Sequence, residues 1–151
     1  MNPFCKANKY IPDHVHIMDI SDADLAKLKA GFNENETAMA SWDLSISDAD
    51  FKKLKVGFLS QQMEDKWNII TADLGRSGKK SVHISRSWTG IEHYVIVIKP
   101  GDGHSGAKIK GIIWKAEQGD RISEEQAKKM AIYLCRALLE GDFESALDFG
   151  P

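Results

Sequence analysis

The chain has 151 residues, of which 42% are hydrophobic and 28% are charged, and its formal net charge is −2. This length and composition predict one soluble globular domain whose core needs neither metals nor disulfide bonds. The negative charge argues against nucleic acid as a partner, and no apolar run reaches the roughly 18 residues of a membrane helix, so we expect no membrane contact. The two cysteines, Cys5 and Cys135, have no metal-binding spacing, and no secretory leader is evident, which favours a cytoplasmic protein.

An internal repeat occupies much of the first part of the chain. The segment 20–32, ISDADLAKLKAGF, returns at 46–58 as ISDADFKKLKVGF, with ten of thirteen positions identical. In each copy a serine, Ser21 or Ser47, precedes an acidic first turn, and apolar residues recur at i, i+3 and i+7. Both copies are therefore predicted to be amphipathic helices. We interpret them as duplicated helices that cover a surface, with a pair of docking helices as the alternative.

Outside the two repeat copies, the sequence predicts a polar connector between them and, after them, a region with the periodicity of strands. Residues 33–41, NENETAMAS, lie between the two copies and are predicted to be a polar connector. Segments rich in β-branched or aromatic residues are predicted strands, at 66–73, 81–85, 91–99 and 108–117. Their short connections predict an antiparallel meander, because parallel neighbours would need long crossovers. Both faces of 94–98, YVIVI, are apolar, which predicts a central strand covered on both sides.

The last predicted element is a helix that begins after Ser123 and ends near Gly141. Two apolar stripes leave a narrow polar side, so we expect contacts from the sheet and from either an N-terminal helix or another subunit of a homo-oligomer. One stripe contains Ala127, Met130, Ala131, Leu134, Ala137 and Leu138, the second contains Ile132, Cys135 and Leu139, and the polar side carries Lys128, Lys129 and Arg136. Cys135 is then a small buried hydrophobe rather than a nucleophile.

These elements predict an α+β fold, in which an antiparallel β-meander of about four strands packs against a C-terminal helix, with two duplicated N-terminal helices. Residues 1–62 form an N-terminal helical extension that contains the repeat, and residues 63–151 form the α+β core, both in one compact unit. The segment 101–106, GDGHSG, matches the letters of a dinucleotide-binding motif. Because strand-like residues follow it, we expect a hairpin loop there.

No motif assigns a cofactor, a metal or a catalytic residue. The chain lacks a phosphate loop, a nucleophile elbow and a zinc-binding helix. His83 and His93 lie on adjacent predicted strands and would face each other if the register allowed, but zinc would require further ligands. Ordinary hydrogen-bonded histidines are the preferred interpretation.

The strongest candidate site joins two short motifs, MEDKW at 63–67 and RSWTG at 86–90. In a meander, the start of the first strand and the turn after the second lie at the same end of the sheet, so the motifs are predicted to meet. Arg86 offers a rigid fork of donors for a carboxylate or phosphate, and Trp67 and Trp88 offer flat walls for a ring. The candidate ligand-binding residues are Glu64, Asp65, Lys66, Arg86, Ser87, Trp88 and Thr89. In the structural alternative, Arg86 pairs with Glu64 or Asp65 and the tryptophans are buried.

At these two motifs the chain resembles a family of small, uncharacterised bacterial proteins and domains that carry an EDKW...RSWTG signature. The resemblance covers residues 63 to about 140 and leaves most of the duplicated helices outside. The longer glycine-rich loop around His104 departs from the usual pattern of that family. Since the family has no assigned activity, the resemblance implies a domain boundary rather than a function.

The charged and aromatic residues of the two motifs leave three functional hypotheses. The first is a small module that binds an anionic, nucleotide-like small molecule at Arg86 and Lys66, with a basic hairpin tip at 76–80 adding positive potential. The second is a protein-interaction or regulatory domain in which EDKW...RSWTG is purely structural. The third is a hydrolase with Glu64 or Asp65 as a general base beside Arg86, and with His93 as an acid. Because no activated nucleophile or metal motif supports the third, we favour binding over catalysis.

Overall fold

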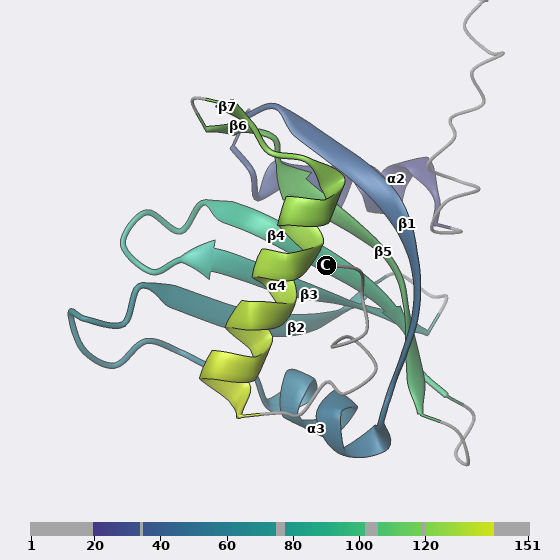
Figure 1. Cartoon of the computed structure of the whole chain (residues 1–151). Helices are drawn as coiled ribbons and strands as arrows, with labels where there is room; N and C mark the ends of the chain where they lie inside the picture. Colours follow the sequence, from purple (N-terminus) through teal and green to yellow (C-terminus); the bar gives the residue numbers. More distant parts are fainter. Residues whose placement is uncertain (1–19, 34, 75–77, 102–105, 119, 141–151) are drawn as a thin grey trace, which may run out of the picture.

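A computed structural model describes residues 20–33, 35–74, 78–101, 106–118 and 120–140. The helices are α2 (Asp22–Ala30), α3 (Asp48–Val56) and α4 (Glu124–Leu139). The main strands are β1 (Thr37–Ile46), β2 (Trp67–Leu74), β3 (Lys79–Arg86), β4 (Glu92–Lys99) and β5 (Ala107–Lys115), and a small hairpin is formed by β6 (Glu117–Gln118) and β7 (Asp120–Arg121) (Figure 1). Cys5, His104 and Gly141 lie outside the described residues, and so do Arg76 of the predicted basic tip and residues 102–105 of the predicted hairpin loop.

The five main strands form one antiparallel sheet in the order β1-β5-β4-β3-β2. Strands β2 to β5 follow one another as hairpins, which confirms the predicted meander within an α+β fold. Strand β4 lies in the middle of the sheet. Its alternate residues enter two separate cores, with Tyr94, Ile96 and Ile98 in one and Val95 and Val97 in the other. The prediction of a central strand buried on both faces is therefore confirmed.

Strand β1 corrects the sequence-based prediction, which placed a polar connector at 33–41 and about four strands in the sheet. Alternate residues of this segment point into the core beneath α4, namely Ala38, Ala40, Trp42, Leu44 and Ile46. This period of two is typical of a strand. The sequence did not reveal this pattern because the first inward-facing residues are small alanines. The last one, Ile46, also begins the second copy of the repeat.

The two copies of the repeat fold as α2 and α3, each with the predicted cap. The Ser21 hydroxyl accepts a hydrogen bond from the Asp24 N–H at 3.1 Å, and the Ser47 hydroxyl accepts one from the Asp50 N–H at 3.1 Å. Such caps satisfy amides that the first helical turn leaves without a partner. The shared sequence therefore starts both helices in the same way.

The two repeat helices cover opposite faces of the sheet. In Figure 1, α4 crosses the near face of the sheet and α2 lies behind it. Helix α2 and the turn after it contribute Leu25, Leu28 and Phe32 to the core that holds Val95, Val97 and Ile113. Helix α3 contributes Phe51 and Leu54 to the core that α4 shares. Each copy thus closes one apolar face of the sheet, as expected for helices that cover a surface.

Helix α4 buries a narrower surface than the sequence predicted. Its buried residues are Ala127, Lys128, Ala131, Ile132, Leu134, Cys135 and Leu139. Met130 and Ala137, which were expected to be buried, are exposed, and Lys128, which was expected on the polar side, is buried. Burial raises the pKa of the Cys135 thiol to about 12, so this residue stays protonated at neutral pH and packs as a small hydrophobe.

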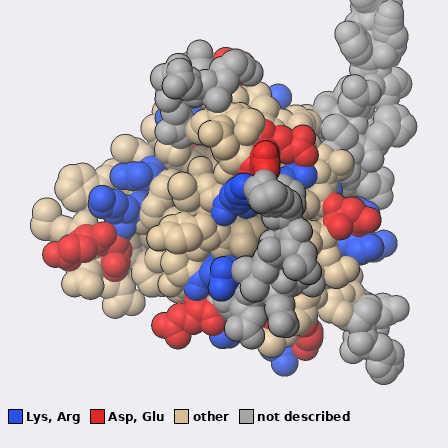
Figure 2. Space-filling model, in the orientation of Figure 1, with Lys and Arg blue, Asp and Glu red and all other residues tan. Residues whose placement is uncertain are grey.

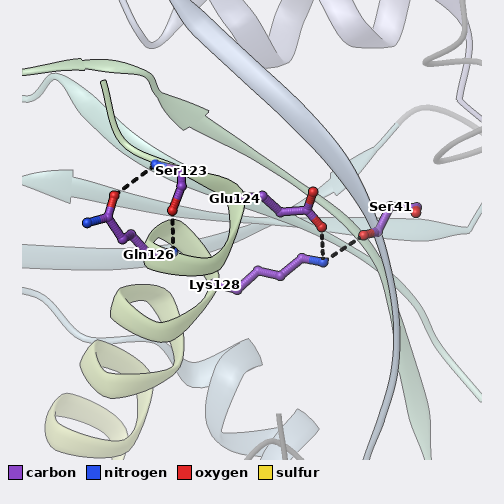
Figure 3. A network of polar contacts seen from close by, with 5 residues as sticks. All are labelled: Ser41, Ser123, Glu124, Gln126 and Lys128. Atoms are coloured by element: carbon purple, nitrogen blue, oxygen red, sulfur yellow. Dashed lines mark hydrogen bonds and ion pairs between the residues drawn. The ribbon is translucent and has the colours of Figure 1, made fainter. Parts of the chain in front are cut away.

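Lys128 is buried because its ammonium group has several partners (Figure 3). Its Nζ donates to the Ser41 carbonyl oxygen at 3.0 Å and to Glu124 Oε2 at 2.6 Å, and lies 5.4 Å from the centroid of the Trp42 ring. A buried charge is tolerated when it is paired and hydrogen-bonded in this way. The contact with Ser41 ties α4 to the edge strand β1.

The face of the molecule that carries α4 has acidic and basic side chains interspersed (Figure 2). None of the helices in the described segments is long and apolar enough to cross a membrane. Among the described residues on this face, Figure 2 shows no large patch of a single sign.

Candidate functional site

The two motifs of the predicted site meet at one end of the sheet. Trp67 is the register partner of Arg86 in the β2–β3 pair. One residue further along, the Ser87 N–H donates to the Lys66 carbonyl oxygen at 2.9 Å, and the Ser87 hydroxyl donates to the Asp65 carbonyl oxygen at 2.8 Å. The predicted proximity of MEDKW and RSWTG is therefore confirmed.

The turn between β3 and β4 is closed by its own hydrogen bonds. The Gly90 N–H donates to the Arg86 carbonyl oxygen at 2.8 Å, and the Arg86 N–H donates to the Ile91 carbonyl oxygen at 3.1 Å. The Ile91 N–H in turn donates to Thr89 Oγ1 at 3.1 Å. The turn fixes the backbone of Arg86 at its base and leaves Trp88 at its tip with 72% of its surface exposed.

The half-buried Arg86 packs on an aromatic ring rather than against an acid. Its Cζ atom lies 4.8 Å from the centroid of the Trp67 ring, which is a cation–π contact. Within the described residues, no carboxylate is within ion-pair distance of this guanidinium. Asp65 Oδ2 instead accepts the Gln61 N–H at 2.9 Å, and Glu64 is exposed. The alternative in which Arg86 pairs with Glu64 or Asp65 and both tryptophans are buried is therefore wrong.

A bulge in β4 brings a third group to this end of the sheet. Ile84 pairs with Tyr94 but the next residue, Ser85, pairs with Glu92, so His93 is an extra residue in the strand. Bulges re-aim side chains in this way. The His93 ring packs edge-on against the Trp67 ring, with centroids 5.3 Å apart and planes at 89°.

His93 is neutral at neutral pH. Burial lowers the pKa of its imidazole to about 4, and the positive charges of Lys115 and Arg86 add to this effect. The sequence analysis did not place Lys115 near His93. The pairing of the adjacent residues Trp114 and Tyr94 in the β4–β5 hairpin brings the two together. A neutral imidazole beside two cations is a poor general acid, which weighs against the hydrolase hypothesis.

We predict that acid stability depends on His93. The pKa of His93 is about 4 in the folded chain and 6.5 in its usual state. Between these pH values, His93 therefore binds a proton in the unfolded chain but not in the folded chain. The free energy of unfolding should therefore fall as the pH is lowered from about 6.5 to 4, and should fall less in His93→Gln. Urea unfolding above and within this window measures the effect, and equal pH dependence of the two proteins would contradict it.

His83 and His93 do not face each other, contrary to one expectation. His83 pairs in register with Val95, on the face that α2 covers. Its Nδ1 lies 2.8 Å from Glu92 Oε2, and its Nε2 lies 2.8 Å from Ser81 Oγ. Sequence reasoning missed this polar row, although the alternation of Ser81 and His83 places both on one face of a strand.

The row of serine, histidine and carboxylate has the connectivity of a hydrolytic triad, but its setting is structural. Ser81 is only 2% exposed in the middle of β3. The Glu92 N–H donates to the Gly31 carbonyl oxygen at 2.9 Å, and a Cβ on Gly31 would lie 2.3 Å from the Glu92 carboxyl carbon. We interpret the row as the contact that holds the end of α2 against the sheet.

The predicted basic hairpin tip is too far away to belong to the Arg86 site. Leu74 pairs with Lys79 seven residues along the hairpin from the Trp67–Arg86 pair. At about 3.3 Å per residue this is roughly 23 Å, more than twice the Debye length of about 8 Å at physiological salt. Lys79 is also buried, and Lys80 forms an ion pair with Asp73. The expectation that this tip adds positive potential at Arg86 is therefore wrong.

The fold and these contacts define an α+β protein in which an arginine stacked on a tryptophan lies at one end of an antiparallel sheet. Comparison of the chain with protein-family models and with curated proteins gave no match. The resemblance to the EDKW...RSWTG family therefore stays a prediction. Across the segments that the structure describes, no three His, Cys, Asp or Glu side chains are grouped as a metal site.

Proposed function

We propose that this protein is a small module that binds an anionic, nucleotide-like small molecule at the end of the sheet that carries Arg86. The observation that carries the proposal is the Arg86 guanidinium, which lies over Trp67 with no carboxylate partner among the described residues. Guanidinium donors form a planar fork that matches a phosphate or a carboxylate. An arginine that is already positioned loses less conformational freedom when a ligand binds.

The surroundings of Arg86 favour a negative ligand. Lys66 and Lys115 lie at the same end of the sheet, and His93 is held neutral there. Trp67 already has the guanidinium on its ring, so the exposed Trp88 is the better surface for a base or sugar ring to stack on. We therefore assign contact with the ligand to Arg86, Lys66 and Trp88.

The remaining predicted site residues shape the loops around Arg86. Ser87 and Asp65 join the two motifs, and Thr89 accepts a hydrogen bond inside the turn. Glu64 is exposed and would repel an anion. Binding without catalysis is the function that fits these roles, in a cytoplasmic protein that contacts neither membranes nor nucleic acid.

A second candidate function is docking of a partner protein. It is favoured by the exposed apolar side chains of Val56, Leu59 and Met63, which precede β2 and are 86%, 60% and 74% exposed. Large exposed apolar side chains mark an interaction site where they form one patch, and a second copy of the chain is one such partner. We prefer small-molecule binding at Arg86 over protein docking, because the charge and the planar fork of the Arg86 guanidinium match a specific class of ligand.

Isothermal titration calorimetry with adenosine 5′-monophosphate tests the main proposal. We expect Arg86→Ala to weaken binding by about 10- to 100-fold, because charge-assisted hydrogen bonds contribute about 1.5–3 kcal/mol. Arg86→Lys should bind with intermediate affinity, since it keeps the charge and loses the fork. The melting temperature of unliganded Arg86→Ala should stay close to that of the wild type, because an arginine outside an ion pair contributes little to folding.

Arg136→Ala is the matched control, because Arg136 is an exposed arginine on α4. It should bind the nucleotide as the wild type does. Equal affinity of Arg86→Ala and Arg136→Ala would contradict the proposal. A large loss of stability in unliganded Arg86→Ala would instead assign Arg86 to the fold.

A further inference from the structure

A cavity of about 730 Å³ lies at the opposite end of the sheet from Arg86. Among the described residues, its lining includes three lysines, Lys99, Lys108 and Lys110, together with Ser45. None of the functional hypotheses drawn from the sequence involves these residues. The strands place the three lysines close together, and their positive charge is only partly compensated. These two observations indicate a second binding site.

The strand register puts two of the lysines side by side. Lys99 of β4 pairs with Lys108 of β5, which in turn pairs with Ser45 of β1. The neighbours Ile98 and Ile109 point into the core beneath α4, so both lysine side chains point to the other face of the sheet. A row of polar side chains thus crosses three strands at the edge of the cavity.

The third lysine of the cavity, Lys110, lies at a bulge in β5. Ile98 pairs with Ile109 and Val97 pairs with Gly111, which leaves Lys110 as an extra residue in β5. Lys110 is two residues from Lys108, and Ile109 between them points into the core beneath α4. Lys110 therefore lies on the side of the sheet that already carries the other two lysines. The pairing of Lys99 with Lys108 and the position of Lys110 in β5 therefore place three positive charges at one cavity.

The positive charge of this cavity is only partly compensated. Like charges directly opposite each other in a sheet are destabilising. Asp43 lies 3.3 Å from Lys108, but no carboxylate of the described chain is within ion-pair distance of Lys99 or Lys110. The described lining contains no acidic residue. A bound anion would offset the repulsion between the lysines.

The lining also indicates the kind of anion. Its volume is in the range of small-molecule sites, about 300–1,000 Å³. The described part of the wall has no aromatic side chain for a base to stack on, and it offers ammonium groups and a hydroxyl as donors. We propose that this cavity binds a compact polyanion of the phosphate class, such as pyrophosphate, independently of the Arg86 site.

Calorimetric titration of the full chain with pyrophosphate tests this second site. The double variant Lys99→Ala/Lys110→Ala should bind at least about tenfold more weakly than the wild type, because each lysine supplies charge-assisted hydrogen bonds. Its melting temperature should equal or exceed that of the wild type, since the substitution relieves repulsion between like charges. A melting curve therefore shows whether the double variant is folded.

The matched control is Lys52→Ala/Lys129→Ala, which removes the same charge from two exposed lysines on helices. This control and Arg86→Ala should bind pyrophosphate as the wild type does. The proposal is overturned if the wild type does not bind, or if both double variants weaken binding equally. Loss of pyrophosphate binding in Arg86→Ala alone would also overturn it, because the anion would then occupy the Arg86 site.

Discussion

Replacing Gly57 with alanine should destabilise the protein by about 2–6 kcal/mol, as the sum of backbone strain and overpacking. Gly57 has φ 75° and ψ −167°, a region that is accessible to glycine almost exclusively. A Cβ at this position would lie 2.4 Å from the Ile69 carbonyl oxygen. Two hydrogen bonds between Phe58 and Ile69, at 2.9 and 2.7 Å, hold the two segments together, so neither can move aside without breaking them.

Gly78→Ala is the control for this prediction. Gly78 also has a positive φ, 83°, but a Cβ there would meet no atom of the described residues within 4 Å. Its substitution should cause strain without a clash and cost about 1 kcal/mol. Urea unfolding of both variants separates the two effects. Equal stability of Gly57→Ala and Gly78→Ala would show that the approach of Gly57 to β2 is not tight.

Leu134→Ala should lower the free energy of unfolding by about 2–5 kcal/mol. Leu134 is 5% exposed and belongs to the core between α4 and the sheet. Its truncation removes apolar contacts and leaves a cavity that rigid neighbours fill only in part. Leu59→Ala is the control, because Leu59 is 60% exposed and its loss should change stability by no more than about 0.5 kcal/mol. Indistinguishable urea midpoints for the two variants would rule out this packing of α4.

The periodicity of the sequence was enough to predict the meander, the central position of β4 and the two repeat helices. Strand β1 was not predicted, because its alanines carry a weak signal and Ile46 also belongs to the repeat. The face of α4 was misassigned at Lys128 for a different reason. Its partner Ser41 lies 87 residues away, in the strand that was missed. Local patterns thus predict elements, whereas a buried charge depends on distant residues.

The meeting of the two motifs was predicted because hairpin connectivity alone determines which strand ends share one edge. The partners of each side chain were not predicted. The Arg86 guanidinium stacks on the Trp67 ring and does not pair with Asp65. The Asp65 carboxylate instead accepts a hydrogen bond from the Gln61 N–H. The bulges at His93 and Lys110 shift the register by one residue, and tertiary packing decides where such shifts occur.

An NMR titration of the His93 ring protons tests the anion site at Arg86 most directly. Without ligand, the imidazole should titrate with a pKa of about 4. An anion bound beside Arg86 favours the protonated imidazole, so saturating adenosine 5′-monophosphate should raise this pKa toward 6.5, and should not do so in Arg86→Ala. A His93 pKa that is the same with and without the nucleotide would contradict an anion site at this end of the sheet.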